Sequence, residues 1–187
     1  MKKLIFCFIL FIGAVFIYRI TEKDIGKELD SFNNVKVFFN EFPTKSLERN
    51  LSKEGYNLGL KYQCVEFMKR YYYEYYDHQM PDSYGHAKDF YNLTLKDGEY
   101  NTKRDLIQFS NPSLVKPQLG DIIIFKPFIF NPYGHVAIIS DIQEDSMEII
   151  QQNVWKKTRE KIKLNYEKGQ WVIDSKRIVG RLSKEEI

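Results

Sequence analysis

Cysteine is scarce in this chain, which has two, Cys7 and Cys64, among 187 residues. They form no Cys-x-x-Cys pair, and the three histidines, His78, His86 and His135, form no His-x-x-x-His pair. Short spacings of this kind bring the ligands together in most structural zinc sites. The sequence therefore argues against a zinc site.

The chain also lacks a strong charge imbalance. Its formal net charge is +3, and Lys2, Lys3 and Arg19 account for all of it. No other run of Lys and Arg is long enough to form the basic stripe with which nucleic-acid binders neutralise phosphates. Hydrophobic residues make up 43% of the chain, which is enough for one packed domain. We expect a monomer with no nucleic-acid partner.

The first twenty residues differ from the rest. Lys2 and Lys3 precede an uncharged run over residues 4–18, which Arg19 ends. A positive stretch before an apolar run is typical of signal peptides, whereas about 20 apolar residues span a bilayer comfortably. No small-x-small cleavage site follows the run. We predict that residues 1–20 form a signal peptide or, preferably, an uncleaved membrane anchor.

The leader also predicts the location of the domain. By the positive-inside rule, Lys2 and Lys3 stay in the cytoplasm and the remaining chain is exported. We expect the domain to be anchored to a bacterial inner membrane, facing the periplasm or the outside. It would be secreted if the leader were cleaved.

Cys64 is then the single thiol of the exported domain, because Cys7 lies in the apolar run and is expected to be an apolar filler. From Cys64 to about Tyr76 there is no Gly or Pro, and apolar residues recur at offsets of three and four. This pattern predicts a half-buried helix with Cys64 in its first turn. Exposed amides and the helix dipole favour a thiolate there.

The other segments predict an α+β fold in which N-terminal helices pack on an antiparallel β-sheet. Residues 21–60 are expected to form short helical pieces joined by loops, with 21–55 as a spacer. A second helix is expected near residues 87–95. Strands are expected where β-branched and aromatic residues follow one another, at residues 122–125, 135–139, 147–150 and 171–173.

Three polar residues could complete a nucleophilic site around Cys64. His135 begins one predicted strand, and Gln151 and Asn153 end the next, on one face by strand alternation. An imidazole can take the thiol proton, and a polar side chain can fix its tautomer. The segment 151–153 could also be an ordinary strand end that leads into a turn. The other two histidines are expected to be surface or packing residues.

Four motifs, in this order, resemble the CHAP family of cysteine- and histidine-dependent amidohydrolases/peptidases. They are Tyr-Gln-Cys-Val-Glu-Phe-x-x-Arg at 62–70, Pro-x-x-Gly-Asp at 117–121, Gly-His-Val-Ala-Ile-Ile at 134–139 and Gln-Gln-Asn at 151–153. Within this family the sequence resembles the amidase domain of glutathionylspermidine synthetase/amidase, over about residues 56–182. The resemblance implies a papain-like fold over 56–187, with Cys64 as nucleophile and His135 as proton shuttle. It also implies an acyl-thioester intermediate and no metal or organic cofactor.

The sequence departs from the family at Gln151, where the family often has a glutamate. A glutamine carbonyl can accept the imidazole N–H but cannot offset an imidazolium charge, so we expect weaker thiolate–imidazolium pairing. Asn153 matches the family and could share the orienting role. Gln63 could supply an oxyanion donor beside the Cys64 N–H, or could serve in packing or capping. Glu66 and Arg70 are expected to form an i,i+4 ion pair.

Two substrate classes and one role without catalysis remain open. The motifs favour a glutathionylspermidine-like amide. The leader favours a peptidoglycan peptide or amide, as for a cell-wall hydrolase or an antibacterial effector. Because position 151 is a glutamine and not the family's glutamate, a non-catalytic, membrane-anchored binding module is the third possibility. A fold does not by itself imply a function.

Overall fold

The computed structural model describes residues 24–41 and 48–184. The signal peptide or membrane anchor predicted at residues 1–20 lies outside this range, as does part of the spacer predicted at 21–55. No helix within the described ranges is long and apolar enough to cross a membrane.

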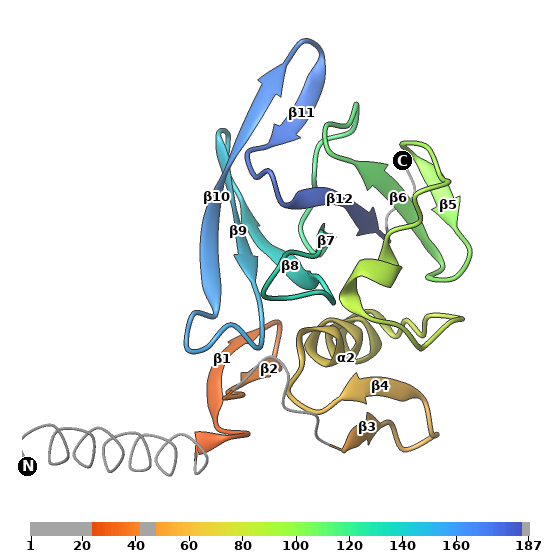
Figure 1. Ribbon diagram of the computed structural model, residues 1–187, viewed down its shortest axis with the longest axis vertical. Coiled ribbons are helices and arrows are strands. Elements are labelled where there is room, and N and C mark those ends of the chain that lie inside the picture. Colours follow the sequence, from red (N-terminus) through yellow and green to blue (C-terminus); the bar gives the residue numbers. More distant parts are fainter. Residues whose placement is uncertain (1–23, 42–47, 185–187) are drawn as a thin grey trace, which may run out of the picture.

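An antiparallel sheet forms the body of the described chain (Figure 1). Its strands are β5 (Glu99–Asn101), β6 (Leu106–Ser110), β7 (Ile122–Phe125), β8 (His135–Ile142), β9 (Ser146–Ile150), β10 (Arg159–Glu167), β11 (Gln170–Ile173) and β12 (Ile178–Ser183). Their spatial order is β11-β10-β9-β8-β7-β12-β6-β5. The four predicted strands are therefore confirmed. Strands β5, β6, β10 and β12 were not predicted. Strand β10 carries a charged or polar residue at most positions, β6 contains Gln108 and Ser110, β5 has three residues, and β12 contains Gly180.

Strands β7 and β8 lie in the centre of the sheet and are buried on both faces. Ile122, Ile124, Val136 and Ile138 point into one core, and Ile123, Ala137 and Ile139 point into another. Side chains of a strand alternate between faces, so a strand covered on both sides needs apolar residues throughout. Strands β10 and β11 curl over the second core.

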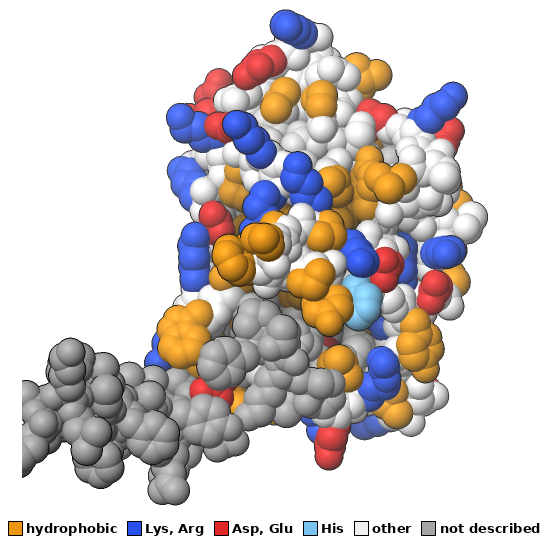
Figure 2. All heavy atoms as spheres, in the orientation of Figure 1, with side chains coloured by type: hydrophobic (Ala, Val, Ile, Leu, Met, Phe, Trp, Pro, Cys, Tyr) orange, Lys and Arg blue, Asp and Glu red, His pale blue; other side chains and the backbone are white. Residues whose placement is uncertain are grey.

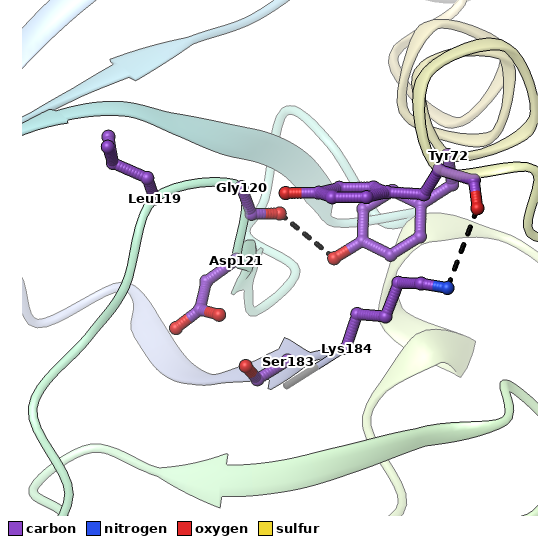
Figure 3. Close-up of a pocket in the computed structure, with 7 residues that line it drawn as sticks. Tyr72, Leu119, Gly120, Asp121, Ser183 and Lys184 are labelled. Atoms are coloured by element: carbon purple, nitrogen blue, oxygen red, sulfur yellow. Dashed lines mark hydrogen bonds between the residues drawn. The ribbon is translucent and has the colours of Figure 1, made fainter. Parts of the chain in front are cut away.

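Helix α2 (Cys64–Tyr76) covers the first core and has the bounds that the sequence predicts. It packs against β8, and Phe67, Met68 and Tyr71 are fully buried in that core. The hydroxyl of Tyr72 donates a hydrogen bond of 2.9 Å to the carbonyl of Gly120, just before β7 (Figure 3). These contacts fix the helix on the sheet and so place Cys64 at its amino end.

The predicted N-terminal helices are not present in the described residues. Two antiparallel hairpins occur there instead: β1 (Glu28–Phe32) with β2 (Val35–Phe38), and β3 (Arg49–Leu51) with β4 (Asn57–Leu60). Asn33 and Asn34 form the first turn with φ of 48° and 66°, a conformation that asparagine tolerates and that matches strand twist. The helix predicted at 87–95 is likewise reduced to the short 3-10 helix η1 (Ala87–Phe90). The fold is thus α+β, with far more strand than expected.

A buried ion pair joins the start of β7 to β12. The Arg181 Nε lies 2.7 Å from the Asp121 Oδ2, and each side chain is only 2% exposed. Arg181 Nη2 also donates to the carbonyl of Val115 at 2.9 Å. The pair satisfies both charges inside the protein, so the loss of either partner leaves the other buried and uncompensated.

Replacement Arg181→Met is expected to lower the free energy of unfolding by about 3–5 kcal/mol, because Asp121 loses its counter-charge. Urea denaturation followed by circular dichroism measures this loss. Arg159→Met is the matched control, since its side chain is 35% exposed where it pairs with Asp30 and Glu148. Arg159→Met should lower the free energy of unfolding by only about 1 kcal/mol. Equal losses in both variants would contradict the special role of the buried pair.

Candidate active site

All five predicted site residues lie in the wall of one cleft of about 1000 Å³. The set consists of Gln63, Cys64, His135, Gln151 and Asn153. The cleft lies at the amino end of α2, beside the start of β8 and the end of β9. Aromatic side chains also line it, and Figure 2 shows hydrophobic side chains gathered over the loop that joins β7 to β8. The folded chain thus brings together residues nearly ninety positions apart in sequence.

A second hollow of about 220 Å³ lies at the other end of α2 (Figure 3). Its walls include Tyr72, Tyr76, Asp121 and Lys184, with neither cysteine nor histidine. Asp121 is already paired with Arg181. Nucleophilic chemistry therefore belongs to the larger cleft.

Cys64 is the first residue of α2 and is partly exposed. Burial of its sulfur raises the pKa of the thiol, and this effect exceeds the opposing one of hydrogen bonds from the backbone of Val136, Val65 and Cys64 itself. The amides at the helix start do stabilise a thiolate, as expected from the sequence, but burial outweighs them. Burial therefore opposes the thiolate that the helix start favours.

His135 is the first residue of β8 and is 9% exposed. Its Nε2 lies 3.0 Å from the Oε1 of Gln151, and its ring packs 5.6 Å from that of Phe125. Gly134 leads into the strand with φ of 74°, and a Cβ there would lie 2.7 Å from the carbonyl oxygen of Phe125. Only glycine allows this close approach, so Gly134 fixes where the imidazole enters the cleft.

The amide orientation of Gln151 determines the tautomer of His135. The Nε2 of Gln151 lies 3.4 Å from the carbonyl of Lys157, to which it donates. Its Oε1 therefore faces the imidazole and can only accept a hydrogen bond. The Nε2 of His135 must then carry the proton, which leaves Nδ1 as the basic nitrogen.

Burial lowers the pKa of His135 to about 4, although the hydrogen bond to Gln151 raises it in part. The nearby charge of Arg177 lowers it further. The imidazole is neutral above that pH and lines the same cleft as the Cys64 thiol, whose pKa burial raises. Burial thus disfavours the charged forms of both groups, and the neutral glutamine at position 151 adds no charge to counter it.

Gln152 connects the end of β9 to the start of α2, a role that the sequence did not indicate. Its Oε1 accepts the Phe38 N–H at 2.7 Å, and its Nε2 donates to the Gln63 carbonyl and to Glu66 Oε2 at 3.0 and 2.9 Å. Glu66 also binds Arg70 Nε at 2.6 Å, so the predicted ion pair is present. Strand alternation predicted that Gln151 and Gln152 point to opposite sides, and they do.

Asn153 contacts Gln63 rather than His135. Its Nδ2 donates to the Oε1 of Gln63, which directs the Gln63 amide nitrogen away from Asn153. Asn153 has a φ of 68°, so the strand has ended and alternation no longer holds. The structure therefore places Asn153 where it can orient the predicted oxyanion donor.

The remaining histidines have different environments. His78 is buried and its Nε2 lies 2.9 Å from the carbonyl of Arg104, a packing role. His86 precedes η1, and its ring lies 4.6 Å from the tilted Tyr133 ring. It lines the cleft, which the sequence did not indicate. Among the described residues no three His, Cys, Asp or Glu side chains are grouped as metal ligands.

Comparison with known proteins gives a match to one family and similarity to curated relatives. The model for the CHAP domain matches residues 55–153. Trypanothione synthetase from Crithidia fasciculata is 31% identical over 120 residues, covering 62% of this chain and 18% of that protein. The bifunctional glutathionylspermidine synthetase/amidase of Escherichia coli (strain K12) is 31% identical over 116 residues, covering 61% and 18%. The match thus spans less than a fifth of either relative.

A solved structure titled "The crystal structure of Ly7917" covers 50% of this chain and 40% of its own, with a TM-score of 0.28 and 18% identity. That score is too low to support a conclusion about fold or function. The family match carries the assignment, and its range contains Cys64, His135, Gln151 and Asn153.

Replacement Gln151→Glu is expected to raise the pKa of His135 by about one to three pH units, because a carboxylate stabilises the imidazolium. NMR titration of the imidazole protons measures it, with His135→Gln used to assign the resonance. Gln151→Met is the matched control and should leave the pKa at or below about 4, since it removes the hydrogen bond that raises it. An unchanged pKa in Gln151→Glu would show that residue 151 does not face the ring.

Proposed function

The chain belongs to the CHAP domain family, and on that premise we propose that it is a thiol-dependent amidohydrolase or peptidase with Cys64 as its nucleophile. The observation that carries the proposal is the shared cleft, in which Cys64 at a helix start and His135 bonded to Gln151 lie in one wall. A nucleophile, a base and a group that orients the base are the parts that covalent amide hydrolysis needs.

The first half of the proposed reaction forms an acyl-enzyme. Nδ1 of His135 takes the proton of the Cys64 thiol as the sulfur attacks the amide carbonyl carbon. The oxyanion of the tetrahedral intermediate accepts hydrogen bonds from the Cys64 N–H and the Gln63 amide. The imidazolium then gives its proton to the leaving nitrogen, the C–N bond breaks, and an amine departs from a thioester.

The second half releases the acid. Water attacks the thioester carbonyl while Nδ1 of His135 accepts its proton, and the thiolate leaves and regains that proton. Throughout, the Nε2 proton stays in the hydrogen bond to Gln151. Because glutamine carries no charge, proton transfer and attack occur together from the neutral pair rather than from a preformed ion pair.

For the substrate, we propose an amide of the glutathionylspermidine type, the class named in the relative from Escherichia coli. The support is 31% identity to that relative over 116 residues, and a peptidoglycan peptide is the other substrate to be tested. We also propose that residues 1–20 direct the domain out of the cytoplasm, on the basis of Lys2, Lys3 and the uncharged run after them. Fractionation of cells expressing the full chain tests that location.

Hydrolysis is tested by incubating the protein with glutathionylspermidine and, separately, with purified muropeptides, and by following the products by mass spectrometry. We expect cleavage of one of the two, and a rate loss of about 10³-fold or more in Cys64→Ala and His135→Ala. Lys176→Met, an exposed change outside the cleft, is purified in parallel and should retain the rate.

Two results would contradict the proposal. One is a folded protein that cleaves neither substrate. The other is equal cleavage by Cys64→Ala and by the unaltered protein. Either would favour the non-catalytic binding module.

A further inference from the structure

Two arginines, Arg49 and Arg177, line the cleft beside the site, and neither is paired with a carboxylate of residues 24–41 or 48–184. Arg177 makes no ion pair and no side-chain hydrogen bond within the described residues, and its Nε is buried without a partner. Arg49 bonds the neutral Oδ1 of Asn57 at 3.1 Å and lies over the Tyr84 ring. Buried or half-buried arginines are normally paired, so an unpaired one in a cleft wall is available to a ligand.

Arg177 is held in place by aromatic rings rather than by an anion. Its guanidinium lies 4.1 Å from the centre of the Phe128 ring and 5.8 Å from that of Phe125. Stacking leaves the N–H groups at the edge of the guanidinium plane able to donate, and this edge matches a carboxylate with two parallel hydrogen bonds. The rings also keep water from part of the group, which strengthens its field.

Arg177 is also close to the reacting groups. Its charge is among the causes that lower the pKa of His135, whose ring packs on the same Phe125. Glu160 also lines the cleft, and its carboxylate forms an ion pair with Lys157 at 3.1 Å. The charge of Glu160 raises the pKa of His135 and so opposes the effect of Arg177, but among the described residues Glu160 forms no ion pair with Arg177.

We propose that Arg177 is a specificity-determining residue that binds a carboxylate of the amide substrate, and this inference rests on the proposed function. The substrate class is then an amide or peptide that bears a free carboxylate near the bond to be cleaved. The guanidinium binds this group in the ground state and in the transition state alike, so its loss raises KM more than it lowers kcat.

The test compares alkylation of Cys64 by iodoacetate and by iodoacetamide, which differ in charge and little in size. The full-length protein should show an iodoacetate-to-iodoacetamide rate ratio about tenfold above that of N-acetylcysteine, as expected for one charge-assisted hydrogen bond. Arg177→Met, which keeps apolar contact with the rings, should return the ratio to that of the free thiol. Lys176→Met removes the same charge from an exposed neighbour outside the cleft and should leave the ratio unchanged. A ratio that is the same in the unaltered protein and in Arg177→Met overturns the inference.

A second measurement does not depend on the reactivity of Cys64. Isothermal titration compares N-acetylglycine with N-acetylglycinamide, and the acid should bind about tenfold more tightly, an advantage that Arg177→Met removes. Equal binding of the two in the unaltered protein overturns the inference. Cleavage of neither substrate, combined with selective binding of the acid, would count against the proposed hydrolysis and still support the anion site.

Discussion

The packing of α2 against β8 is the contact on which both the core and the candidate site depend. Phe67, Met68 and Tyr71 bury one face of the helix against Val136 and Ile138. The same packing brings the sulfur of Cys64 to the backbone of Val136, one residue after His135. A shift of the helix along the sheet would therefore break these core contacts and would also move Cys64 away from His135. Gln152 strengthens this connection, because it joins the end of β9 to Gln63 and Glu66 at the helix start.

This packing has an electrostatic consequence. The contacts that place the thiol and the imidazole also bury both, so the pKa of Cys64 is raised and that of His135 is lowered to about 4. A carboxylate at position 151 would counter the second effect, but glutamine can only orient the ring. The proposed mechanism therefore begins from neutral partners, and the stacked cation of Arg177 adds to the preference for a neutral imidazole.

The sequence predicted the features that depend on local pattern. Helix α2 was found because its apolar spacing is unbroken by Gly or Pro, and the opposite directions of Gln151 and Gln152 follow from strand alternation. The first hairpin was missed, although Val35 and Val37 alternate with an exposed Lys36, because four residues give too weak a period. Features set by tertiary contacts could not be predicted. Burial of the thiol depends on the whole core, and the turn at Asn153 depends on its left-handed backbone.

The pH dependence of Cys64 alkylation by iodoacetamide tests the neutral pair most directly. Rates are measured from pH 4.5 to 10 on the unaltered protein, with mass spectrometry used to identify the modified residue. A neutral thiol requires the rate to rise toward alkaline pH without a plateau on the acid side, because little thiolate exists below the raised pKa of Cys64. A high, constant rate that persists below pH 6 would reveal a preformed thiolate–imidazolium pair and contradict this account.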